Sequence, residues 1–185
     1  MSDASLRHGP AEAGGASLPV DRRAAFAMLT DEHLSSAYRL AGVILGDPIE
    51  GQDATHDAVV AAWRSYGSLR DPARFEAWFG RILVNVCRSR LRRRRKGTIV
   101  DLDDGRDVAA GDPIGRVDDR IAFDRAFERL SPDQRVAVAM RYWADLTVDD
   151  IAERVGVPAG TIKSRLHSAI ERLHDVLGES TEAVR

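Results

Sequence analysis

Five polar residues suited to anion binding recur in one stretch of the sequence, at spacings of four, three, four and three. They are Arg81, Asn85, Arg88, Arg92 and Arg95. On a helix these spacings place all five side chains on one face, spread over about four turns or roughly 20 Å. A guanidinium group makes bidentate hydrogen bonds to phosphate, and an amide among such groups can read a base edge. The stretch predicts a nucleic-acid surface, although a solvated Arg-rich helix end gives the same pattern.

A second polar face lies near the end of the chain. Projection at about 100° per residue divides residues 161–177 into two sides and a flank. The polar side holds Lys163, Ser164, His167, Ser168 and Glu171. The apolar side holds Ile162, Leu166, Ala169, Ile170, Leu173 and Leu177, and the flank holds Thr161, Arg165 and Arg172. A DNA recognition helix needs this division, with donors for bases and phosphates on one side. An ordinary amphipathic hairpin is the alternative.

The residues before this face predict a helix-turn-helix. Thr147 with Asp150 three residues later forms the pattern of a capping box, and Gly156 permits a tight turn before the next helix. Further upstream, Ser131 followed by a proline and Gln134 predicts another strong helix start.

Most of the remaining sequence also predicts helix. Apolar residues recur at near-helical spacing over 21–46, a second helix is expected over about 53–66, and a third begins near residue 75. Trp63 and Trp78 are assigned to the core and not to base stacking. No strand-like alternation or internal repeat occurs, so we predict an all-α fold class of two small helical domains joined by a flexible acidic linker.

Charge is strongly segregated along a chain whose net charge is −2. Residues 75–97 carry seven Arg and one Lys against one Glu, a net of +7, and residues 98–119 carry seven Asp against two Arg, a net of −5. The acidic segment has no sustained period and contains three Gly and a Pro, which is typical of a linker. At about 3.3 Å per residue it would reach roughly 70 Å. An acidic solubilising segment is the alternative.

The predicted domain organisation follows from these patterns. A disordered N-terminal tail covers 1–20, the first helical domain 21–97, the linker 98–119, the helix-turn-helix domain 120–178, and a C-terminal tail 179–185.

Several function classes are excluded. One cysteine, Cys87, leaves no internal disulfide and fits a reducing compartment. No apolar run approaches the roughly 18 residues of a membrane span, and the N-terminal segment lacks the apolar core of a secretory signal. Phosphate loops, His-Glu metalloprotease motifs and Cys/His clusters are absent, and an EF-hand loop starting at Asp101 would place its glycine one position early. We expect no catalytic activity, metal or cofactor.

Three segments together resemble sigma-70 family RNA polymerase sigma factors of the compact extracytoplasmic-function (ECF) type. "DATHDAVVAAWRSY" resembles the helix that docks on the clamp coiled coil of bacterial RNA polymerase. "RFEAWFGRILVNVCRSRLRRRRK" looks like the promoter-melting helix that follows it. "LSPDQRVAVAMRYWADLTVDDIAERVGVPAGTIKSRLHSAIERL" is similar to the family's helix-turn-helix domain almost position by position. The resemblance covers roughly residues 21–177.

The resemblance implies a cytoplasmic, dissociable subunit whose partners are core RNA polymerase (clamp coiled coil and flap), promoter DNA and an anti-sigma factor. It implies that Asp53, His56 and Asp57 face the polymerase, with His56 standing where the family commonly has Gln. Asn85 would hold a flipped base of the −10 element. The backbone contacts there would come from Arg88, Arg92 and Arg95. The −35 element would be contacted by Thr161, Lys163, Ser164, Arg165, His167 and Ser168.

A stand-alone helix-turn-helix transcriptional regulator is the alternative function. Such a protein binds duplex DNA by itself, usually as a symmetric dimer. It would leave the acidic and cationic helices of the first domain without a role, whereas a sigma factor needs both and depends on core polymerase.

Overall fold

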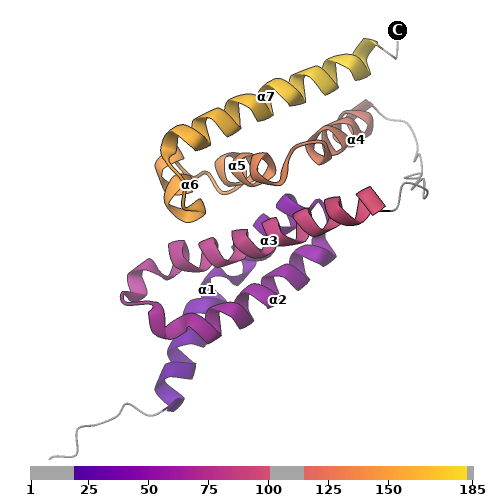
Figure 1. The fold of residues 1–185 in the computed structure, drawn as a ribbon. Helices are drawn as coiled ribbons and strands as arrows, with labels where there is room; N and C mark the ends of the chain where they lie inside the picture. Colours follow the sequence, from indigo (N-terminus) through magenta and orange to yellow (C-terminus); the bar gives the residue numbers. More distant parts are fainter. Residues whose placement is uncertain (1–18, 101–114, 183–185) are drawn as a thin grey trace, which may run out of the picture.

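The computed structural model describes residues 19–100 and 115–182, and the side chains of residues 22–95 and 121–177. The terminal segments 1–18 and 183–185 and the central part of the acidic segment, 101–114, lie outside the described residues, so the predicted tails and most of the linker are not tested. Over the described part the chain is helical and contains no strand, which confirms the all-α prediction (Figure 1).

The helices form two bundles (Figure 1). The first bundle consists of α1 (Pro19–Leu45), α2 (Pro48–Ser65) and α3 (Phe75–Val100), with two short 3₁₀ turns, η1 (Tyr66–Ser68) and η2 (Pro72–Arg74), between α2 and α3. The second consists of α4 (Gly115–Glu128), α5 (Pro132–Tyr142), α6 (Val148–Val155) and α7 (Ala159–Glu182). Residues 98–100 and 115–119 of the predicted linker are therefore helical.

The connection between α1 and α2 is two residues long. Gly46 ends α1 in a left-handed conformation (φ 74°), and the Asp47 carboxylate caps α2 by accepting the first free backbone N–H groups. Pro48 at the first helical position starts α2 earlier than predicted. The two helices cross closely at Gly42 and Gly51, since neither residue has a Cβ. A Cβ atom added to Gly51 would lie only 2.5 Å from the backbone nitrogen of Gly42.

Both predicted capping boxes in the second bundle are confirmed. Ser131 and Gln134 exchange hydrogen bonds at the start of α5, and Thr147 and Asp150 do so at the start of α6. Hydrogen bonds from the hydroxyl and backbone N–H of Thr147 lower the pKa of the Asp150 carboxyl. Gly156 ends α6 with φ 74°, so the turn into α7 uses the residue that tolerates this conformation. The α6–α7 pair is the predicted helix-turn-helix.

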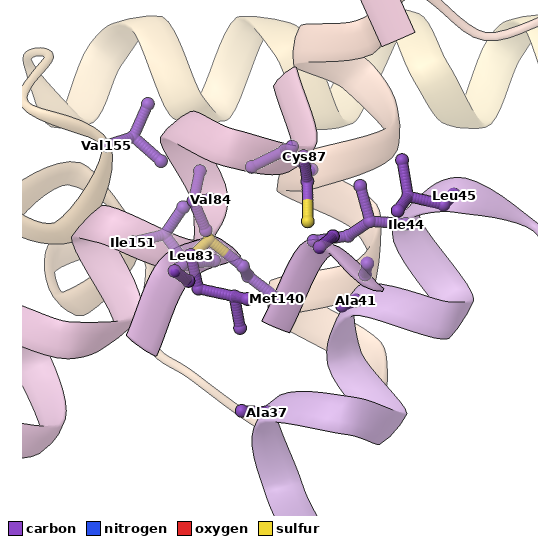
Figure 2. Packing of buried hydrophobic residues seen from close by; sticks show 14 of the residues in the cluster. Ala37, Ala41, Ile44, Leu45, Leu83, Val84, Cys87, Met140, Ile151 and Val155 are labelled. Atoms are coloured by element: carbon purple, nitrogen blue, oxygen red, sulfur yellow. The ribbon is translucent and has the colours of Figure 1, made fainter. Parts of the chain in front are cut away.

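The two bundles share one buried apolar cluster. Figure 2 shows buried side chains from α1, α3, α5 and α6 gathered together, among them Ile44, Leu83, Met140 and Ile151, each at most 2% exposed. The sequence predicted two modules but did not predict that their cores would join. Cys87 lies in the same cluster, and its burial raises the pKa of the thiol to about 12.

Two sequence predictions about apolar residues are wrong. Trp63 was assigned to the core, but it is 40% exposed at the edge of the first bundle, where its ring meets Phe26. Ile170 was assigned to the apolar side of its helix but is 37% exposed. Each lies at the margin of an amphipathic face, where periodicity alone does not decide whether a neighbouring helix covers the side chain.

Candidate nucleic-acid interface

The polar face of α3 is set by the burial of its opposite face. Phe79, Leu83 and Leu91 are buried in the core, and this leaves Asn85 exposed to solvent between cationic neighbours. The helix thus presents the predicted face, and an exposed amide is free to offer both its donor and its acceptor. Arg81 is exposed as well. Its guanidinium lies close to the turn at Gly156, since a Cβ atom added to Gly156 would be only 2.8 Å from Nη2 of Arg81.

The arginines of this face meet the second bundle. Arg88 is largely buried, and its Nη2 lies 2.6 Å from Oδ1 of Asp133, at the start of α5. Arg92 is more exposed, and its Nη2 lies 3.7 Å from the same oxygen. Nη2 of Arg95 donates a hydrogen bond of 2.7 Å to the backbone carbonyl of Leu130. These three cationic groups are therefore engaged within the chain.

The predicted recognition helix, α7, exposes Lys163, Ser164, His167 and Ser168, while Thr161 is half-buried at its base. His167 Nε2 lies 3.3 Å from a carboxylate oxygen of Glu171, one turn further on. Within the described part of the chain, no ion pair involves Lys163. This face can therefore offer an ammonium, hydroxyls and an imidazole to a groove without breaking core packing.

Two side chains of α5 contact α7, one on its flank and one on its polar side, and neither contact was predicted from the sequence. Asp133 Oδ2 lies 3.4 Å from Nη2 of Arg165, and Gln134 Nε2 donates a 3.0 Å hydrogen bond to the hydroxyl of Ser168. The segment "SPDQ" was interpreted only as a helix start. Its carboxylate and amide also position two residues of the recognition helix, and no local pattern indicates this because the partners are 32 and 34 residues apart.

The residues predicted to face polymerase lie together on α2. Asp53, His56 and Asp57 are all exposed. His56 Nε2 lies 2.9 Å from the hydroxyl of Tyr38 on α1, and Asp57 forms an ion pair with Arg90 of α3. The neighbouring α2 side chains are apolar and exposed, with Ile49 at 73% and Val60 at 49%. Their spacing puts them on the same side of the helix as the acidic residues, a mixed surface typical of a protein contact.

The described residues give no support to other kinds of site. No group of three or more His, Cys, Asp or Glu side chains among them could hold a metal ion. No helix in the same part of the chain is long and apolar enough to cross a lipid bilayer.

Over the residues that the structure describes, a helix-turn-helix in one bundle and a cationic helix with an exposed amide in the other are features of a DNA-binding protein. Two family models match the chain, sigma-70 region 2 over residues 29–97 and sigma-70 region 4 over residues 120–173.

Known relatives are ECF sigma factors. The chain is 37% identical over 156 residues to the ECF RNA polymerase sigma factor SigM of Mycobacterium tuberculosis, covering 84% of this chain and 79% of that protein. It is 31% identical over 147 residues to the RNA polymerase sigma-E factor of Streptomyces avermitilis, covering 80% and 79%. Among solved structures, the sigma factor RpoE from Bartonella quintana, in complex with the anti-sigma factor NepR, matches with a TM-score of 0.63 at 26% identity, covering 83% of this chain and 96% of that one.

This chain belongs to the sigma-70 family, and within it to the ECF RNA polymerase sigma factors. The family consists of transcription initiation factors and not of enzymes, in agreement with the expectation from the sequence.

Proposed function

We propose that this chain is a dissociable, cytoplasmic subunit that binds core RNA polymerase and places it on promoters by reading two DNA elements. The observation that carries this proposal is that each of the two regions matched by the family models contains a helix with exposed polar side chains, α3 in one and α7 in the other. Residues 21–97 act as the melting domain, 98–119 as the linker and 120–178 as the upstream-binding domain.

The α3 face acts on the −10 element. The exposed amide of Asn85 holds an extruded base, while Arg88, Arg92 and Arg95 bind the backbone of the same strand. Extruding a base costs a few kcal/mol, so a pocket that accepts it must be supported by contacts with polymerase. The α2 surface of Asp53, His56 and Asp57 supplies those contacts, and its exposed apolar neighbours support this role.

The α7 face acts on the −35 element in duplex form. Lys163, Ser164, His167 and Ser168 enter the major groove, while Thr161 and Arg165 contact the flanking backbone. The fixed positions of Arg165 and Ser168 against α5 support this role, because a preordered side chain loses less entropy on binding. An anti-sigma protein is the regulatory partner we propose, by analogy with the relative solved in such a complex.

Transcription in vitro tests the proposal. A library of genomic fragments is transcribed by bacterial core RNA polymerase with and without the chain, and we expect new, promoter-dependent transcripts only with it. Tight binding to intact duplex sites without polymerase, together with no effect on transcription, would favour the stand-alone regulator instead.

Two variants separate the roles of the two faces and serve as controls for each other. Asn85→Ala should impair open-complex formation, measured by permanganate reactivity, while binding to core polymerase is retained. Lys163→Ala with Ser164→Ala should weaken upstream protection in footprinting without moving the start of melting. If Asn85→Ala abolished polymerase binding as well, its assignment to an extruded base would be wrong.

A further inference from the structure

A glutamine outside the recognition helix holds one of the serines on its polar side. Gln134 lies at the start of α5, which contacts α7 (Figure 1), and its Nε2 donates a 3.0 Å hydrogen bond to the hydroxyl of Ser168. We propose that Gln134 is a positioning residue that keeps Ser168 a hydrogen-bond acceptor, so that Ser168 recognises the amino group of an adenine or a cytosine. This inference rests on the proposed function of α7 at the −35 element.

The direction of the hydrogen bonds around Gln134 is set by backbone groups at both ends. The backbone N–H of Ser131 can only donate, and its nitrogen lies 2.9 Å from Oε1 of Gln134. The amide of Gln134 therefore turns its NH₂ group toward Ser168. The carbonyl oxygen of Arg165 can only accept, and it lies 3.3 Å from the hydroxyl oxygen of Ser168. The hydroxyl proton of Ser168 thus points to Arg165, and Gln134 occupies one of the two lone pairs of the hydroxyl.

The second lone pair of the Ser168 hydroxyl is left for DNA. Ser168 is exposed on the polar side of α7, so a base edge in the major groove can reach it. The bases that donate there are adenine, through its N6 amino group, and cytosine, through its N4 amino group, whereas N7 and O6 of guanine and O4 of thymine only accept. An acceptor at this position therefore recognises an amino group and not a ring nitrogen or a carbonyl oxygen.

Gln134 preserves this arrangement when DNA approaches. An exposed serine in a helix changes rotamer easily, and in another rotamer its oxygen leaves the carbonyl of the preceding turn. The bond from Gln134 holds the oxygen of Ser168 where it reaches Arg165, so donation to a base would break an existing hydrogen bond, whereas acceptance breaks none. Ser164, one turn earlier, also donates to a backbone carbonyl, that of Thr161 at 3.0 Å, but no side chain among the described residues holds its hydroxyl.

The test uses core polymerase carrying the full-length chain, on a promoter found in the transcription assay. Substitution of each upstream base pair, compared between the wild type and Ser168→Ala, identifies the base pair that Ser168 contacts. That pair is then altered chemically: its amino group is deleted, with purine for adenine or 2-pyrimidinone for cytosine, or its N7 acceptor is deleted with a 7-deazapurine. Apparent affinity for each promoter is measured by transcription at limiting polymerase.

Two variants of the α5 start separate positioning from stability. Gln134→Met removes the donor to Ser168 but keeps the length of the side chain and a good helix former. Ser131→Ala is the matched control. It removes the hydroxyl that caps α5, while its backbone N–H still bonds Oε1 of Gln134 and leaves the contact with Ser168 in place.

We expect deletion of the amino group to weaken the promoter about fivefold or more for the wild type and for Ser131→Ala, and less than about twofold for Ser168→Ala and Gln134→Met. Deletion of N7 should change none of them by more than about twofold. A wild type that responds to N7 and not to the amino group, a Gln134→Met variant as sensitive as the wild type, or a Ser168→Ala variant with unchanged base preferences would overturn the inference. A chain that gives no transcripts beyond those of core polymerase would refute the proposed function itself, and the inference with it.

Discussion

Replacing Met140 by Ala tests whether the two bundles unfold as one unit. The Met140 side chain is 0% exposed and belongs to the cluster shared by α1, α3, α5 and α6. Truncating a fully buried methionine costs about 2–5 kcal/mol. For a chain of this size each kcal/mol lowers the melting temperature by about 2–4 °C, so we expect a loss of about 4–20 °C. Met28→Ala is the matched control, because Met28 is 74% exposed and its truncation should cost less than about 0.5 kcal/mol.

The assay must report on the bundle that does not contain Met140. Trp63 and Trp78 lie in the first bundle and Trp143 follows α5, so in a Trp143→Phe background the emission comes from the first bundle alone. If the bundles form one cooperative unit, Met140→Ala lowers the midpoint of this signal as much as it lowers the calorimetric transition. A first-bundle midpoint that stays within about 1 °C of the Trp143→Phe parent would refute the shared core.

Two other predictions concern local packing and pH. Gly51→Ala should destabilise the chain by about 1–3 kcal/mol in urea unfolding, because the new methyl group meets the backbone of Gly42, whereas Gly160→Ala, with open space around its Cα, should be neutral or stabilising. Burial raises the pKa of the Cys87 thiol from 9.0 to about 12, so its contribution to stability is complete below pH 9 and is lost as the pH rises toward 12. At pH 10 the wild type should therefore have lost about 1.4 kcal/mol more than Cys87→Ala, relative to pH 8, and equal losses would contradict the burial effect.

Local features of the sequence determined most of the helices. The capping residues Ser131 and Thr147 and the turn at Gly156 were predicted correctly because a cap involves only neighbours along the chain. The exposed face of α7 followed from periodicity for the same reason. The start of α2 was predicted near residue 53, although Asp47 and Pro48 carry the local signal of a cap and a first helical residue.

The sequence by itself determined that this chain is helical, that it carries two polar faces suited to DNA, and which side chains each face contains. Only the tertiary structure decided which of those side chains are engaged. Arg88 and Arg165 are far apart in sequence, and they meet at Asp133 because the apolar sides of α3, α5 and α7 must be covered by other helices. Helix periodicity fixes which face is apolar, but the partner that covers it depends on packing across the whole chain.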